Sequence, residues 1–309
     1  MKILVKTNGM AREEWLRWRC MGIGGSDVSV IAGINKYRSV FQLWLEKTGQ
    51  ETPQGADSEY THFGNILEPV VRQEFMRRTG LKVRRKRAIL QSGEYPFMLA
   101  DLDGVINENG TMCIFEAKTA SAYKKAAWEE GVPLEYQFQV QHYMAVTGAG
   151  KTYIAALVGG NSFIYHEVPR DEEMIGNIIR MEREFWECCV LAGQEPKADG
   201  SVATTDFLDG RYGASNGKAV ELPEEALPLC DMYDELAKRI EELKAKKDAA
   251  ANQLKSYLKE NESGTVGNRR IDWKTVTTTT FDKKRLKEER REIYDAYCAE
   301  SHYRRLSVA

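Results

Sequence analysis

The chain has 309 residues, of which 42% are hydrophobic and 29% are charged, and its formal net charge is −2; these values are ordinary for a soluble globular protein with one large domain or two modest ones. No stretch approaches the roughly 18 apolar residues of a membrane span, and the start, MKILVKTNGM, is too short and too polar for a signal peptide, so we expect a cytoplasmic protein. The six cysteines form no C-x-x-C pair, which argues against a zinc or iron–sulfur site.

The N-terminal region predicts helices around a Gly-Gly-Ser turn. A helical pattern begins at Arg12, and the turn at 24–26 leads into an apolar helix for which Ser26 is a suitable N-cap. Further helices are expected over 38–49 and over 62–80, where apolar residues recur at helical spacing.

Strand-like segments dominate the next region. The first three, at 81–90, 97–106 and 112–118, are separated by the turn signals QSGEYP and NENG, which predicts a hairpin or meander. Beyond them we expect helices over 121–130, 133–148 and 171–193, and a closing pair of strands over 151–160 and 162–170.

The composition changes after the last of these helices, where Gly, Ser, Asp and Thr become frequent. We interpret residues 196–222 as a linker between a domain over 1–195 and a tail over 223–309. Within the tail, 223–261 is charged with a thin apolar stripe, which is typical of a helical hairpin or coiled coil. Residues 265–282 alternate like a small β extension, and the end, YRRLSV, is strand-like. The tail could contact a partner or DNA.

An acid and a base close one of the apolar strands. Glu116 and Lys118 are two residues apart, so a strand places both side chains on the face of Ile114. Glu68, Asp103 and Glu116 form a set of acids of the kind that holds Mg²⁺, a hard ion that activates water and neutralises phosphate charge. Asp103, twelve residues, then Glu-Ala-Lys is a known nuclease signature. By itself it also fits an ion pair on a surface strand.

A basic run lies between the predicted Glu68 helix and the Asp103 strand. Residues 77–87 contain seven basic side chains and no acid. Their position favours contact with a DNA backbone over a merely solvated edge. The candidates are Arg84, Arg85, Lys86 and Arg87.

Five motifs stand in order in the first two-thirds of the chain. They are WLRWRCMGIGGSDV from Trp15, FGNILEPVVRQEF from Phe63, LADLDGV from Leu99, FEAKTA from Phe115 and YQFQVQHYMAVTG from Tyr136. In this order they resemble the YqaJ-type viral recombinase family, which comprises lambda exonuclease-like nucleases of the PD-(D/E)xK superfamily. The resemblance implies an α/β, restriction-endonuclease-like core with a central mixed sheet flanked by helices.

The resemblance also implies roles for the matching residues. The metal ligands would be Asp103, Glu116, the main-chain carbonyl of Ala117 and Glu68. Lys118 would act on the water or phosphate, and Gln139 would position the nucleophile or the scissile phosphate. Arg19 and Ser26 would bind a phosphate, taken as the 5′-terminal one, and Tyr136 would support that pocket.

The activity implied by the family is Mg²⁺-dependent 5′→3′ digestion of double-stranded DNA from its ends. Two ions are expected, and Mn²⁺ could substitute. The product would be a 3′ overhang for a single-strand annealing protein in phage-type recombination, and related enzymes form trimers. The protein would belong to a phage or prophage in a bacterial host. Two alternatives stay open: an endonuclease or nickase on the same core, and a non-catalytic DNA-binding scaffold.

Some residues have two possible roles. Asp101 occupies the place of a serine in the family motif, so it could be a further metal or water ligand, or it could raise the pKa of a neighbouring acid by repulsion. His142 could be a general base, but a lone histidine beside aromatic residues is more often structural. Gln139 and Gln141 lie on different helix faces, so at most one is expected to serve the site. Ser26 could cap a helix and bind phosphate at once.

Overall fold

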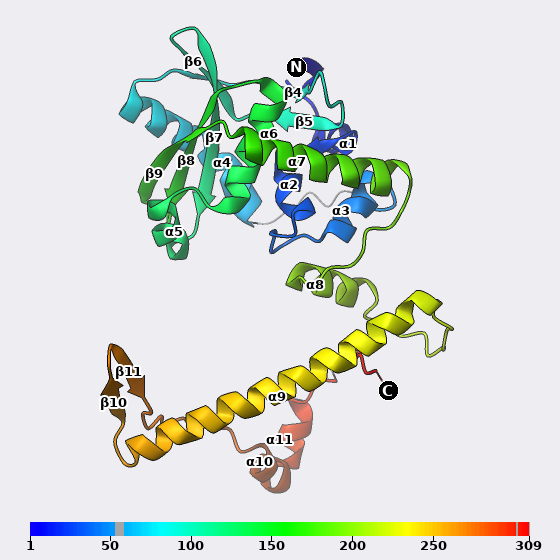
Figure 1. Ribbon diagram of the computed structural model, residues 1–309, viewed down its shortest axis with the longest axis vertical. Coiled ribbons are helices and arrows are strands. Elements are labelled where there is room, and N and C mark those ends of the chain that lie inside the picture. The colour runs from blue at the N-terminus through cyan, green and yellow to red at the C-terminus, as the bar shows by residue number, and fades with distance from the viewer. Residues whose placement is uncertain (53–58, 301, 309) are drawn as a thin grey trace. The chain divides into compact units, whose positions relative to one another are not determined.

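The computed structural model describes residues 1–52, 59–300 and 302–308. The chain divides into two compact units, Met1–Arg211 and Tyr212–Ala309, which are described separately (Figure 1). No helix in the described ranges is long and apolar enough to cross a membrane.

The first unit is built around a mixed sheet that has five strands within the described residues. Its central strands, β7 (Thr111–Ala120) and β8 (Lys151–Val158), run parallel, whereas every other neighbouring pair in this sheet is antiparallel. A parallel pair needs a crossover, and α5 (Lys125–Glu130) and α6 (Leu134–Thr147) form it. The strand order is β3 (Val83–Arg84), β6 (Gly104–Glu108), β7 (Thr111–Ala120), β8 (Lys151–Val158) and β9 (Ser162–Pro169).

Helices cover both faces of this sheet because β7 alternates its apolar side chains. Ile114 belongs to the larger core, together with residues of α6 such as Met144. Phe115 points to the other face, where its ring lies 5.0 Å from that of Phe75 on α4 (Glu59–Thr79). On the face of Ile114, α6 contacts β7 and β8, and α7 (Glu172–Glu184) packs on α6; the two helices lie next to each other in Figure 1. The α/β class and the mixed, helix-flanked sheet expected from the sequence are confirmed.

A second, smaller sheet brings the N-terminal turn to the site. Its strands are ordered β1 (Lys2–Lys6), β4 (Ala88–Gln91), β5 (Met98–Asp101) and β2 (Ile23–Gly24). The short β2 pairs in parallel with β5. This pairing places the Gly-Gly-Ser turn beside the end of β5.

The N-terminal helices of the unit are α1 (Arg12–Cys20), α2 (Gly25–Ile31) and α3 (Val40–Lys47). The expectation that Ser26 caps α2 is wrong: Gly24 is the N-cap, and the Asp27 carboxylate accepts a hydrogen bond from its amide at 3.0 Å. An acid at this position can reach back to the N-cap, so the helix begins two residues earlier than the serine suggested.

The unit ends differently from the sequence expectation. The last turns of the predicted 171–193 helix are a π-helical segment, Phe185–Leu191. A further helix, α8 (Val202–Arg211), lies within the interval expected to be a linker, and Ala203 and Thr204 are buried. The apolar side chains of this helix, including Phe207 against Phe41, explain why the segment folds.

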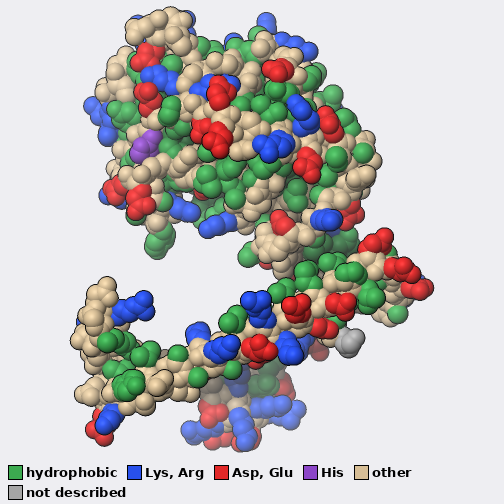
Figure 2. Space-filling model, viewed as in Figure 1, with side chains coloured by type: hydrophobic (Ala, Val, Ile, Leu, Met, Phe, Trp, Pro, Cys, Tyr) green, Lys and Arg blue, Asp and Glu red, His purple; other side chains and the backbone are tan. Residues whose placement is uncertain are grey.

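The second unit contains one long helix where a helical hairpin was expected. The helix α9 runs without a break over Leu227–Leu258, because its interior is rich in Ala, Leu, Glu and Lys and lacks Gly. Acidic side chains gather toward its N-terminal end and basic ones along its middle (Figure 2). A hairpin of β10 (Ser263–Val266) and β11 (Arg269–Asp272) follows, then α10 (Lys283–Glu289) and α11 (Arg291–Ala296).

The strand predictions for the rest of this unit are wrong. Residues 273–282 and 302–308, all within the described part of the chain, form no strand. Valine and threonine favour strands only where a neighbouring strand or a core is there to pack against, and most side chains in both segments are exposed.

Candidate active site

The acid and the base at the end of β7 lie on one face, as predicted. Glu116 is only 3% exposed. The Lys118 Nζ donates a hydrogen bond to its Oε1 at 2.8 Å. Because one residue separates Glu116 and Lys118 on the strand, both side chains lie on the same face of β7, where this contact joins them.

One face of α6 completes this group. The Gln139 Nε2 donates to Glu116 Oε1 at 2.8 Å and to the Tyr143 hydroxyl at 3.0 Å, while its Oε1 accepts from Lys118 Nζ at 2.9 Å. The Tyr136 ring centroid lies 5.0 Å from the same ammonium. Spacings of three and four residues place these α6 side chains on one face. Tyr143 is a member of the site that the sequence analysis missed, although its position four residues after Gln139 indicated it.

Asp103 joins this group from the turn between β5 and β6. Its Oδ2 accepts a hydrogen bond from the Ala117 amide at 2.8 Å. The following glycine has a structural cause, since a Cβ on Gly104 would lie 2.3 Å from Val83 Cγ1. The Asp-Gly pair therefore lets the chain turn tightly enough to bring the carboxylate against β7.

The electrostatics of these side chains favour a cation. Burial raises the pKa of Glu116, and burial together with the Glu116 charge raises the pKa of Asp103 well above its usual range. The Oε2 of Glu116 is buried and has no hydrogen-bond partner among the described residues. A hard divalent ion held by these oxygens would supply that partner and relieve the repulsion, so the two acids fit a metal site.

Glu68 lines one cavity together with Asp103 and Glu116, but its carboxylate faces basic partners. Its Oε1 accepts hydrogen bonds from Arg72 at 2.8 Å and from Arg85 at 3.1 Å. Accordingly, no three acidic, histidine or cysteine side chains in the described part of the chain are gathered as they would be around an ion. For Glu68 to bind a metal, its carboxylate must leave these arginines.

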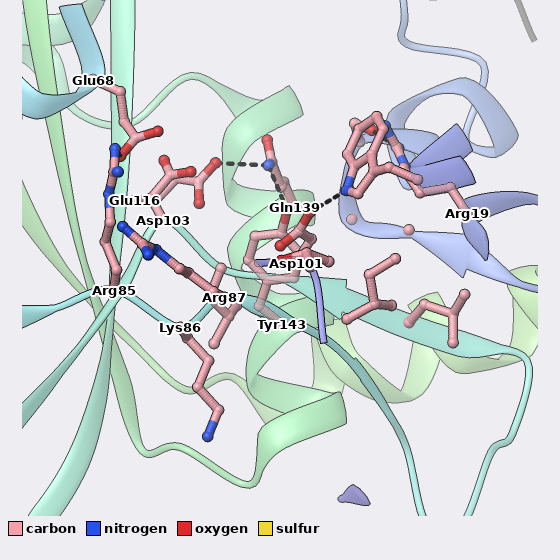
Figure 3. A pocket seen from close by; sticks show the side chains of 18 of the residues that line it. Arg19, Glu68, Arg85, Lys86, Arg87, Asp101, Asp103, Glu116, Gln139 and Tyr143 are labelled. Atoms are coloured by element: carbon pink, nitrogen blue, oxygen red, sulfur yellow. Dashed lines mark hydrogen bonds and ion pairs between the residues drawn. The ribbon is translucent and has the colours of Figure 1, made fainter. Parts of the chain in front are cut away.

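The predicted residues come together in two cavities with shared walls. The larger one, of about 460 Å³, is lined by both acids and cations: Arg85 pairs with Glu68, whereas Arg19 lies on the far side of the cavity from Glu68 (Figure 3). A second cavity of about 440 Å³ shares Glu68, Asp103 and Glu116 and adds Ala117, Lys118 and Tyr136. Arg84 is not among the described residues that line either cavity. The predicted residues around the larger cavity are Arg19, Ser26, Glu68, Arg85, Lys86, Arg87, Asp103, Glu116 and Gln139.

The side opposite the acids is formed by α1 and the start of α2. The Arg19 Nη2 donates to the Ser26 hydroxyl at 2.7 Å, and its guanidinium lies 4.9 Å from the centre of the Trp15 ring. The indole of Trp15 in turn donates to Asp101 Oδ2 at 2.7 Å. This link from α1 to β5 was not predicted, although the four-residue spacing of Trp15 and Arg19 placed them on one helix face.

Asp101 also faces the larger cavity. Burial raises its own pKa, and its charge contributes to the raised pKa of Glu116. The repulsive role considered from the sequence is therefore present, and a role as a ligand stays a prediction.

The structural interpretation of His142 is supported. The ring is fully buried, with Nδ1 2.6 Å from Glu182 Oε1 and Nε2 2.8 Å from the Leu99 carbonyl oxygen. Gln141 likewise has a structural role, because its amide donates to the Pro169 carbonyl at 2.8 Å. Of the two glutamines, Gln139 is the one at the site.

Comparison with known proteins places the chain in a family. Residues 14–150 match the model of the YqaJ-like viral recombinase domain. Over 311 aligned residues the chain is 42% identical to the uncharacterized protein YqaJ of Bacillus subtilis strain 168, covering 99% of this chain and 97% of that protein.

Solved structures show the same fold. The alkaline exonuclease LHK-Exo from Laribacter hongkongensis matches with a TM-score of 0.51 at 21% identity, over 59% of this chain and 93% of that one. Its complex with dAMP gives a TM-score of 0.51 at 20% identity, over 64% and 97%. At this identity the likeness concerns the fold. With its sequence match over nearly the full length, the chain belongs to the YqaJ-like viral recombinase family.

Proposed function

We propose that the protein is a divalent-metal-dependent nuclease that digests double-stranded DNA from its ends in the 5′→3′ direction. The observation that carries this proposal is the group of Asp103, Glu116, Lys118 and Gln139, of which Glu116 and Gln139 are buried, beside a cavity that also presents Arg19 and Ser26. The fold shared with an enzyme described as an alkaline exonuclease supports it.

The acids of this group would hold the metal. Asp103, Glu116 and the carbonyl of Ala117, with Glu68 after release from its arginines, would bind Mg²⁺, as two ions that Mn²⁺ could replace. When bound, the metal supplies neutralisation of phosphate charge and acidification of water.

Lys118 serves as a cation and hydrogen-bond donor in this proposal. Burial opposes its charge, but Glu116 and Asp103 outweigh burial and raise its pKa. Beside the acids that hold the metal, this side chain would act on the water or on the phosphate. Gln139 would fix the relative positions of the Lys118 ammonium and the Glu116 carboxylate, because it is hydrogen-bonded to both. This matters because small displacements of reacting groups slow a reaction strongly.

Direction would come from the other side of the cavity. Arg19 and Ser26 offer a guanidinium and a hydroxyl for a terminal 5′-phosphate. Arg85, Lys86 and Arg87 would contact the DNA backbone. A single-strand annealing protein would bind the 3′ overhang that remains, as in phage-type recombination. The enzyme would act as a trimer. Residues 212–309 would form a separate unit.

Digestion of linear and closed-circular duplex DNA in Mg²⁺ or EDTA tests the proposal. We expect only the linear DNA to disappear, only in Mg²⁺, and faster with a 5′-phosphate than with a 5′-hydroxyl. Cutting of the circle would replace the proposal with an endonuclease or nickase. Survival of both DNAs in Mg²⁺ and in Mn²⁺ would replace it with a DNA-binding scaffold.

A further inference from the structure

A buried cluster of charges lies beneath Arg19 and Ser26. Its centre is Asp27, which is 1% exposed. The Oδ2 of Asp27 accepts from Lys47 Nζ at 2.8 Å, and its Oδ1 accepts from Arg38 Nη1 at 2.9 Å. Arg19 is a more distant member, since its Nη2 lies 3.7 Å from Oδ1.

Lys47 ties the two segments that carry the cavity donors. Its side chain is only 3% exposed. Besides Asp27, its ammonium donates to the carbonyl of Arg19 at 2.9 Å and to that of Gly22 at 2.7 Å. These carbonyls belong to the end of α1 and to the residues just before β2, so Lys47 fixes the path of the chain from Arg19 to Ser26.

The cluster contains one more cation than acid. Arg38 also pairs with Glu46, so the acids Asp27 and Glu46 face the cations Lys47, Arg38 and Arg19. Among these five described side chains, only Arg19 lines the cavity. The surplus positive charge is therefore presented where an anion would enter.

The charged side chains of the cluster compensate one another for the loss of solvent. Burial opposes the ionisation of Asp27, but Lys47, Arg19 and Arg38 together hold the pKa of that carboxyl far below its usual range. Burial lowers the pKa of Lys47, and Asp27 opposes this effect. An ion pair without solvent is retained only when its partners compensate it well.

We propose that Lys47 is a positioning residue for recognition of a terminal phosphate: by neutralising Asp27 it leaves the guanidinium of Arg19 available, with Ser26, to a phosphate in the cavity. The inference rests on the proposed function in taking the ligand to be a 5′-phosphorylated DNA end. Without Lys47, Arg19 is the nearest unpaired cation to Asp27 and turns toward it, away from the cavity.

Three variants separate this role from simple support of the fold. Lys47→Met removes the charge and keeps a long unbranched side chain. Asp27→Asn with Lys47→Met removes both charges, so Arg19 again has no buried acid to neutralise. Lys125→Met, on the surface of α5 with its side chain 53% exposed, is the matched control.

Binding of a short duplex with a 5′-phosphate or a 5′-hydroxyl is measured by fluorescence anisotropy in EDTA, and cleavage of both duplexes is measured in Mg²⁺. We expect Lys47→Met to lower the phosphate preference in affinity by about tenfold, the effect of losing one charge-assisted hydrogen bond. The double variant should restore the preference, and Lys125→Met should keep it. A purely structural role predicts the opposite order, with the double variant at least as impaired.

The outcomes are distinguishable. An unchanged preference in Lys47→Met, or a preference in the double variant as low as in the single one, overturns the inference. If Lys47→Met does not fold, the double variant decides alone, because it must keep the wild-type preference. Cleavage by the wild type without any phosphate preference overturns the inference and leaves the nuclease intact. Preferential binding of the 5′-phosphorylated duplex without cleavage would overturn the proposed nuclease and leave this inference intact.

Discussion

Replacing Gly25 with alanine should displace Tyr143 and Gln139 and so impair the site. A Cβ on Gly25 would lie 2.5 Å from Tyr143 Cε1 and 3.0 Å from Gln139 Cγ. Carbon atoms prefer about 3.5–4.0 Å, so Tyr143 has to move by roughly 1 Å. The ring is buried and its hydroxyl accepts from Gln139, so the shift also breaks that hydrogen bond.

The two effects have separable magnitudes. Overpacking costs about 1–3 kcal/mol and the lost hydrogen bond about 1 kcal/mol, so urea unfolding should show a loss of about 2–4 kcal/mol. Displacing Gln139 by about 1 Å should slow cleavage on the order of 100-fold in the molecules that remain folded.

Gly176→Ala is the matched control for this substitution. Gly176 lies inside α7, and in the described ranges no atom outside its chain neighbours and the adjoining helix backbone comes within 4 Å of an added Cβ. Alanine there should stabilise the protein by up to about 1 kcal/mol and leave cleavage unchanged. Wild-type cleavage by Gly25→Ala would refute the packing argument that joins Gly25 to Gln139.

Three further predictions concern stability and the extent of the active unit. Because the folded-state pKa of Asp103 is raised, the contribution of this carboxyl to stability is complete below about pH 4 and is lost as pH rises through the raised pKa. In EDTA, Asp103→Asn should therefore become more stable than the wild type as pH increases. A difference in urea unfolding that stays constant with pH would contradict this. His142→Ala should destabilise the protein by about 3–5 kcal/mol, because it leaves Glu182 buried and unpaired, while cleavage per folded molecule at low temperature stays within a factor of about three, as a residue outside the catalytic machinery should allow. A chain ending at Arg211 should remain folded and cleave DNA, because every residue around the larger cavity precedes it; loss of cleavage by this folded chain would give the second unit a catalytic role.

The parts of the site that could be predicted follow local periodicity. Strand alternation placed Glu116 and Lys118 on one face, and helical spacing placed Tyr136 and Gln139 on another, so each pair needed only its own element. The ordered motifs then indicated that these elements meet. Asp103 was identified by the glycine after it, which the close approach of Val83 requires.

The parts that could not be predicted depend on contacts between distant segments. The hydrogen bond from Trp15 to Asp101 joins residues 86 positions apart. The arginines that hold Glu68 come partly from its own helix and partly from beyond it, so a spacing rule shows only Arg72. Asp27 and Lys47 each look like ordinary charged residues in sequence, and only the packing of α2 against α3 buries them together.

The helix α9 shows a different limit. Its apolar stripe indicated correctly that the segment is helical, but an apolar stripe does not say whether the chain turns back on itself. A turn most often contains Gly or Pro, and beyond Pro228 in its first turn this helix has neither. Composition decided the outcome there, and the periodicity alone did not.

The central claim is that Lys118, Glu116 and Asp103 form the site that cleaves DNA. The most direct test is single-turnover cleavage of a 5′-phosphorylated linear duplex in Mg²⁺ by Lys118→Ala and Glu116→Ala, with duplex binding measured in parallel and Lys125→Ala as the control. The account predicts that both variants lose cleavage by a factor on the order of 100 or more and still bind DNA. Full cleavage by either variant would contradict the assignment of the site.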